Sequence, residues 1–178
     1  MRQAAKPIAK KDIGSRKLST LIAKMNRALA QESYGVALAA PQVGSSVRMF
    51  IVAGKAFETD EEKKGFEEEK EDTPAPPNRV FINPELVRLS KKKKEMSEGC
   101  LSVRGKYGTV LRHEKATVKA LDEHGVPFIY HASGLIAHIF QHECNHLDGV
   151  LYIDKTIQLE EDEDIRSARK KVKEKHGI

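Results

Sequence analysis

The residues whose types and spacing are best suited to chemistry form the segment HECNH at positions 142–146. If this segment is helical, His142 and His146 lie on one face, where two imidazoles can hold one metal ion. Glu143 lies beside them and can exchange a proton with a water molecule on that metal. The pattern therefore predicts a metal site with a carboxylate placed for acid–base chemistry.

A metal site of this kind needs a third protein ligand. One candidate is a downstream carboxylate, Glu163 or Asp164. A third histidine beyond Gly149 is not available, because Tyr152 stands at the position where that ligand would be expected. The remaining candidate is the Cys100 thiolate, although a lone cysteine is more often a small buried side chain.

The two histidines require a helix, which is predicted over residues 132–147, with Ser133 as its capping residue and Gly149 just past its end. A second helix is predicted over residues 15–31, where apolar residues recur at the spacing of one helix face. Acidic residues followed by basic ones predict a third helix over residues 159–175.

Strands are predicted for short stretches that are rich in β-branched and aromatic residues. They cover residues 47–53, 79–84, 108–113, 116–121 and 126–130. The segment 35–44 is expected to be irregular, and the lysine run 91–94 is expected to form a hairpin tip. The expected fold is α+β, with antiparallel β-sheets around a central metal-binding helix and a further helix at the C-terminus.

Length, charge and cysteine content restrict the class of protein. A chain of 178 residues fits a single domain, in which residues 54–78 form an acidic, proline-containing insertion loop. No apolar run approaches the ~18–20 residues of a membrane helix, and the N-terminus lacks the apolar region of a secretory signal. Two cysteines are too few for a disulfide framework, so the expected location is cytoplasmic.

Three segments, in this order along the chain, resemble the three motifs of peptide deformylases: GVALAAPQVG at 35–44, EGCLS at 98–102 and QHECNHLDG at 141–149. The resemblance implies that Cys100, His142 and His146 bind one divalent metal ion. Fe(II) is the expected native ion, and Zn(II), Ni(II) or Co(II) would suit the same ligands.

The resemblance also implies a reaction: hydrolysis of the N-formyl group from the N-terminal formyl-methionine of nascent peptides, with release of formate. The nucleophile would be water activated by the metal, with Glu143 as general acid and base. The Gln42 side chain and the Leu101 backbone amide would form the oxyanion hole. Substrate-binding positions are expected at Gly35, Val36, Ala37, Gly99, Leu135 and His138.

The sequence departs from the usual family pattern at several points. Ala37 replaces a glycine and adds a methyl group near the substrate, whereas Asn145 replaces an aspartate and removes a charge beside the metal ligands. Family members usually have a longer segment ahead of the region that matches residues 6–8 of this sequence, where only a few residues precede it. These departures leave open a second interpretation, a deformylase-like metallohydrolase that acts on another N-formyl or amide substrate.

The net charge of +5 supports a competing class, a protein that binds RNA. The lysine run 91–94 and the basic C-terminal stretch are its candidate contacts, but no RNA motif with interleaved aromatic residues accompanies them. Because deformylases act where nascent chains emerge, we expect a weak ribosome contact through residues 166–175. No membrane partner is expected.

Overall fold

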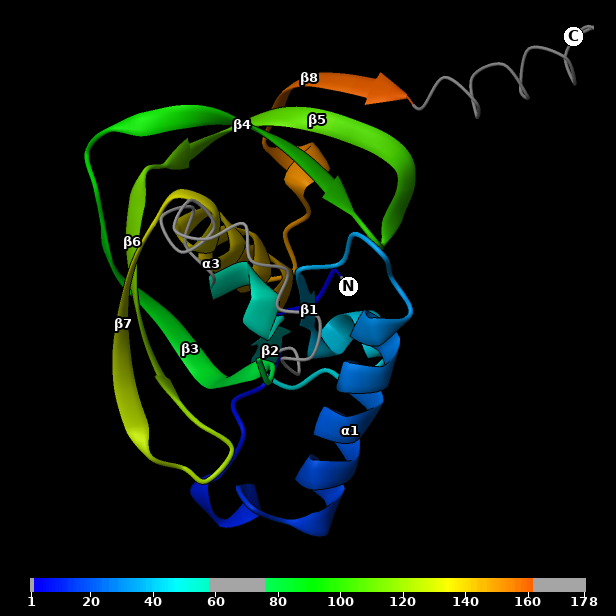
Figure 1. Cartoon of the computed structure of the whole chain (residues 1–178), viewed down its shortest axis with the longest axis vertical. Coiled ribbons are helices and arrows are strands. Elements are labelled where there is room, and N and C mark those ends of the chain that lie inside the picture. Colours follow the sequence, from blue (N-terminus) through cyan, green and yellow to red (C-terminus); the bar gives the residue numbers. More distant parts are fainter. Residues whose placement is uncertain (1, 58–75, 162–178) are drawn as a thin grey trace, which may run out of the picture.

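The computed structural model describes residues 2–57 and 76–161. In these ranges, two antiparallel sheets surround one helix, α3 (Gly134–Leu147) (Figure 1). The strand order is β1-β2-β3-β6-β7 in one sheet and β4-β5-β8 in the other. The predicted α+β arrangement around the helix that carries the two histidines is therefore confirmed. None of the helices in these ranges is long and apolar enough to cross a membrane.

The elements have the following bounds. The five-stranded sheet consists of β1 (Ala37–Ala39), β2 (Met49–Val52), β3 (Arg79–Leu89), β6 (Lys115–Leu121) and β7 (Pro127–Ser133). The three-stranded sheet consists of β4 (Lys93–Cys100), β5 (Val103–His113) and β8 (Thr156–Glu161). The remaining helices are α1 (Arg16–Ala30) and the short 3-10 helices η1 (Lys10–Asp12), η2 (Ala40–Val43), η3 (Gly54–Phe57) and η4 (Tyr152–Asp154).

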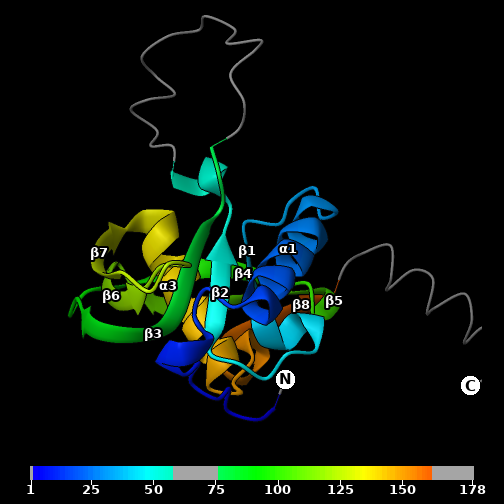
Figure 2. The same cartoon turned by 90° about the horizontal axis from the view of Figure 1, so that it is seen from below.

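Strand β2 lies between two hydrophobic cores, and Figure 2 shows α1 and α3 on opposite sides of it. Successive side chains of a strand point to opposite faces. Phe50 and Val52 belong to the core that includes α3, whereas Met49 and Ile51 belong to the core that includes α1. All four side chains are fully buried, which explains the uninterrupted apolar run in the sequence.

Helix α1 confirms the helix predicted over residues 15–31, one residue shorter at each end. The Ser15 side chain accepts a hydrogen bond from the Leu18 backbone N–H at 3.3 Å and so caps the first turn. Leu18, Met25 and Leu29 are buried, as their spacing on one face predicts.

The N-terminal segment is held by backbone pairing. Ile8 donates its N–H to Asn83 Oδ1 and accepts a bond from Asn83 Nδ2, each at 2.8 Å. The Ala5 N–H donates to the carbonyl of Leu147 at 2.7 Å, and Lys6 forms a parallel bridge with Val47. The bond from Ala5 connects this segment to the C-terminal end of α3, the helix that carries the two histidines.

The last described strand shows that the prediction of a helix over residues 159–175 is wrong at its start. Residues 159–161 belong to β8, where Leu159 lies opposite Gly108 of β5 and Glu161 lies opposite Lys106. Pairing with a distant strand outweighed the charge order, which carries no information about sheet partners. Residues 162–175 lie outside the described part of the chain.

The lysine run does not form a hairpin tip within one sheet. The chain turns at residues 90–92, where the Ser90 hydroxyl donates to the carbonyl of Lys92 at 2.8 Å, and it passes there from the five-stranded to the three-stranded sheet. Lys93 and Lys94 already belong to β4. This strand was not predicted, because its sequence KKEMSEGC has few residues that favour strands.

Other element boundaries differ from the predictions. The segment 35–44 contains the edge strand β1, β2 is shorter than predicted, and four predicted strands are longer than expected: β3, β5, β6 and β7. Helix α3 starts at Gly134 instead of residue 132, because Ala132 and Ser133 still pair with β6. Ser133 occupies the N-cap position, but its side chain makes no capping hydrogen bond. Gly149 follows the helix with the expected positive φ of 76°.

Part of the predicted insertion at residues 54–78 is ordered against the sheet. Residues Gly54–Phe57 form η3, and the Phe57 ring meets the Tyr130 ring edge-on, with 5.5 Å between centroids. The Arg79 guanidinium lies 4.2 Å from the centre of the Phe57 ring. Residues 58–75 of this insertion lie outside the described residues.

Candidate metal and active site

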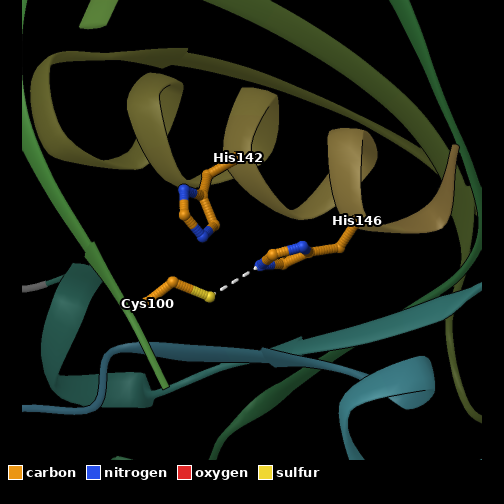
Figure 3. Close-up of side chains that lie close together, drawn as sticks. All are labelled: Cys100, His142 and His146. Carbon is orange, nitrogen blue, oxygen red and sulfur yellow. Dashed lines mark hydrogen bonds between the residues drawn. The ribbon is translucent and has the colours of Figure 1, made fainter. Parts of the chain in front are cut away.

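The structure brings Cys100, His142 and His146 together. Cys100 ends β4, and the two histidines project from one face of α3 toward it (Figure 3). The Cys100 Sγ lies 3.1 Å from His146 Nε2, and the three potential ligand atoms lie within 4.8 Å of one another. The alternative ligands Glu163 and Asp164 lie outside the described residues.

The chemistry of this donor set fits a divalent metal ion. One thiolate and two imidazoles suit Fe(II), Zn(II), Co(II) or Ni(II). His146 must be neutral to act as a ligand. Burial, together with the nearby His142, lowers the pKa of His146 to about 3. Its Nδ1 is also a buried atom without a hydrogen-bond partner among the described residues.

Glu98 is a buried carboxylate that orients His142. Its Oε2 accepts a hydrogen bond from His142 Nδ1 at 2.7 Å, so His142 presents Nε2 to the other ligands. Arg112 donates to the same carboxylate through Nε at 2.6 Å and Nη2 at 3.0 Å, and His138 donates through Nε2 at 2.6 Å. Burial works to raise the pKa of Glu98, but the hydrogen bonds from His138, His142 and Arg112 hold it well below its usual range.

The pKa of His142 is shifted in the opposite direction to the pKa of His146. Burial works to lower the pKa of His142, but its hydrogen bonds with Cys100 and Glu98 and the nearby Glu143 charge raise it to about 10. In the metal-free protein this imidazole is therefore protonated near neutral pH. A metal ion must displace that proton before Nε2 can bind it.

Arg112 connects this network to Asn145. Its Nη1 donates to the Asn145 side-chain oxygen at 2.6 Å, so the contact persists without the charge of an aspartate. Neither Glu98 nor Arg112 was predicted from the sequence to be a site residue. One signal was available for Glu98, because it is the first residue of the EGCLS motif that also contains Cys100.

Glu143 has the environment of a general base. Its side chain is buried beside the cluster of Cys100, His142 and His146, and its Oε2 has no hydrogen-bond partner among the described residues. Desolvation by burial raises its pKa to about 7, outweighing the lowering effect of His142. A carboxyl group with a pKa near the working pH can both take and return a proton.

Gln42 is oriented by its own backbone turn. Its Oε1 accepts a hydrogen bond from the Ala39 N–H at 2.7 Å, which directs the amide NH2 group into the site. Nε2 then lies 3.2 Å from Ser102 Oγ and 3.7 Å from Cys100 Sγ. Leu101 directly follows Cys100 and lines the same cavity.

A cavity of about 610 Å³ opens beside these groups. Its walls include all of the expected substrate-binding positions: Gly35, Val36, Ala37, Gly99, Leu135 and His138. Gln42, Leu101, Glu143, Cys100 and His142 line it as well. Other lining side chains were not anticipated from the sequence, among them Tyr34, Met96, Tyr107 and Ile139.

A Cys-His-His site beside a buried carboxylate, at the wall of a cavity between two sheets, defines a metal-dependent hydrolase. The family model described as polypeptide deformylase matches residues 1–162. The chain belongs to the peptide deformylase family. It is an enzyme that removes the N-formyl group from nascent peptides.

Individual relatives show the same family. The chain is 37% identical over 178 residues to peptide deformylase 1 of Pseudomonas syringae pv. tomato, covering 100% of this chain and 91% of the relative. It is 39% identical over 162 residues to the peptide deformylase of Halothermothrix orenii, covering 91% and 90%. A crystal structure of a class I type b peptide deformylase from Acinetobacter baumannii, bound to Met-Ala-Ser, superimposes with a TM-score of 0.72 at 32% identity, covering 86% and 90%.

Proposed function

We propose that Cys100, His142 and His146 hold one divalent metal ion, with Fe(II) as the native ion and Zn(II), Ni(II) or Co(II) as functional substitutes. When bound, the ion supplies Lewis-acid chemistry, which lowers the pKa of water and polarises a carbonyl oxygen. Glu98 keeps His142 in the ring orientation that presents Nε2 to the site. This assignment is supported by the close approach of the three ligand atoms.

We propose Glu143 as the general acid and base. It takes a proton from the attacking water and returns it to the nitrogen that leaves as the free amine. The observation that carries this role is the buried, unpartnered Oε2 of Glu143 at the cavity wall, on the residue directly after the ligand His142.

The oxyanion formed by attack on the formyl carbon needs hydrogen-bond donors. The Gln42 amide group and the Leu101 backbone N–H are proposed for this role. The Ala39–Gln42 hydrogen bond fixes the Gln42 amide before substrate arrives, and such preorganised donors contribute about 3 kcal/mol each to transition-state stabilisation.

The substrate peptide is proposed to lie extended along the edge of β1. This strand ends the five-stranded sheet, and Gly35, Val36 and Ala37 line the cavity beside its edge. An extended peptide can add to such an edge through backbone hydrogen bonds. Gly99 lines the same cavity, and a Cβ atom there would lie 3.0 Å from the Tyr107 ring, which would have to shift to accommodate it. The Acinetobacter baumannii relative binds Met-Ala-Ser, a tripeptide of the kind that deformylation leaves.

The decisive experiment measures formate release from formyl-Met-Ala-Ser by anaerobically purified protein. Glu143→Gln is measured alongside, with metal content determined in both. We expect turnover by the parent, and in the variant retained metal with kcat lower by about 10²–10⁴-fold. Full activity of Glu143→Gln would contradict the assigned role. Loss of metal in Cys100→Ala, with the fold intact, would be expected from its role as ligand.

A contact with the ribosome through the basic residues 166–175 is a further proposal, and these residues lie outside the described part of the chain. The proposed location is the cytoplasm, where formylated nascent chains emerge. Co-sedimentation with ribosomes should weaken steeply with salt, since contacts of Lys and Arg with phosphate release counterions. Absence of co-sedimentation at low salt would contradict the contact.

Hydrolysis of another N-formyl or amide substrate by the same site is a second candidate function. One observation favours it: His138, a polar residue, lines the substrate cavity.

A further inference from the structure

One face of α3 forms a wall of the substrate cavity. Leu135, His138, Ile139 and His142 lie at the spacing of a single helix face, and all four line the cavity. His138 lies four residues, about one helical turn, before the ligand His142, a displacement of about 6 Å along the helix axis. A side chain that starts near the metal ligands and runs along α3 therefore reaches His138 with its tip.

The His138 ring is held firmly in this wall. Its Nε2 is 2.6 Å from Glu98 Oε1, and its side chain is 10% exposed. Glu98 also lines the cavity, but its side chain is only 1% exposed, so the imidazole offers a ligand more accessible surface than the carboxylate that it contacts. Much of the surrounding wall is apolar and consists of Val36, Met96, Leu101, Leu135 and Ile139.

The hydrogen bond from His138 helps to stabilise the buried Glu98 carboxylate, but it is one of four that this carboxylate accepts from the described residues. Arg112 and His142 already donate three hydrogen bonds to the Glu98 carboxylate. A purely apolar side chain at position 138 would serve a pocket that admits only hydrocarbon or thioether chains.

We propose that His138 makes the far end of the first-side-chain pocket polar. The enzyme then also accepts formyl peptides whose first residue has an unbranched side chain ending in a hydrogen-bonding group, with glutamine as the representative. Glutamine is close in length to methionine, and its tip both donates and accepts, so it can pair with the free edge of the ring. This inference rests on the proposed function, because it takes the metal site as the place where the formyl group reacts.

The test compares kcat/KM for formyl-Gln-Ala-Ser and formyl-norleucine-Ala-Ser, two substrates that differ in the polarity of the tip. We expect the glutamine-to-norleucine ratio to be at least about tenfold higher in the parent than in His138→Leu. A ratio is used because a general disturbance of the metal site lowers both rates. The matched control is His131→Leu on β7, a histidine that pairs with Thr117 on an exposed part of the sheet, and it should keep the ratio of the parent.

Equal ratios in the parent and in His138→Leu would overturn the proposal. A parent that favours norleucine over glutamine by more than about a hundredfold would overturn it without any variant. If His138→Leu does not fold, His138→Met, which is also apolar, replaces it, and the same comparison of ratios applies. Failure of the parent on formyl-Met-Ala-Ser would instead contradict the proposed function, so the two failures can be told apart.

Discussion

The two sides of α3 are built in different ways. On one side, the Phe140 ring packs against Phe81 and Tyr130, with 5.1 and 5.7 Å between ring centroids, in a core of apolar and aromatic residues. On the other side, buried charges and histidines are joined by short hydrogen bonds that converge on Glu98. The five-stranded sheet covers the first side, and the three-stranded sheet supplies Glu98 and Arg112 to the second.

Stability and chemistry are therefore assigned to different sides of α3, the first to the apolar core and the second to the polar network. Truncating a side chain in an apolar core costs the transfer free energy of the removed atoms plus a term that grows with the cavity left behind. A buried polar network depends on every member, because removing one partner leaves another buried and unsatisfied. Substitutions on the two sides should therefore differ in what they change as well as in size.

Glu98→Gln should have the largest effect, because it alters both stability and metal binding. It removes the buried charge that pairs with Arg112, at a cost of about 3–5 kcal/mol of unfolding free energy. It also weakens the support of His142, so metal affinity should fall by about 10–100-fold. Chemical denaturation and a chelator competition measure the two effects. Glu95→Gln, at an exposed position of the same strand, is the control and should leave both unchanged.

Phe140→Ala should have a comparable effect on stability and none on metal affinity. Truncating this fully buried ring removes contacts with its aromatic neighbours and should cost about 3–5 kcal/mol. The same two measurements apply. A fall in metal affinity as large as that of Glu98→Gln would show that the two sides of α3 are not independent.

The pH dependence of metal binding sharpens the contrast further. His142 has a pKa raised to about 10, so metal binding releases its proton at any pH below that value. Apparent affinity should therefore fall by about tenfold for each unit of decreasing pH from this proton alone. Zinc titrations between pH 6 and 8 test the slope, with His124→Ala in an exposed turn as the control. A flat profile would contradict a protonated His142 in the metal-free enzyme.

Asn145→Asp should have the smallest effect. The Arg112–Asn145 hydrogen bond becomes charge-assisted, which should stabilise the fold by about 0.5–1 kcal/mol. Thermal unfolding measures this gain in stability. Asn145→Ala should instead lower the stability, because it removes the hydrogen bond with Arg112. A destabilised Asn145→Asp would indicate that the nearby Glu98 charge outweighs Arg112.

The sequence predicted those parts of the molecule that local patterns encode. Helix α1 and most of α3 follow from the spacing of apolar residues, and the clustering of Cys100 with His142 and His146 follows from motif resemblance. Strands β4 and β8 were not predicted, because the residues of β4 have little strand preference of their own and β8 is held by pairing with β5, which lies far from it in the sequence.

The polar network was unpredictable for the same reason. Glu98 and Arg112 are 14 residues apart, and they meet only because the register of β4 and β5 places both beside α3. Asn145 was recognised as a departure from the family pattern, but its partner was not, since a hydrogen bond to a neighbouring strand leaves no periodic signal. The sequence indicated the candidate site residues, and the fold showed which neighbouring residues contact and orient them.

Strand β2 has a consequence for how the molecule unfolds. Its side chains alternate between two cores, so neither core can open while the other keeps this strand in place. The two helices and the five-stranded sheet should then unfold as one cooperative unit rather than as separate layers. The amide hydrogens of Phe50 and Ile51, at the centre of that strand, should exchange with solvent only when the whole unit opens, and they would report its global stability.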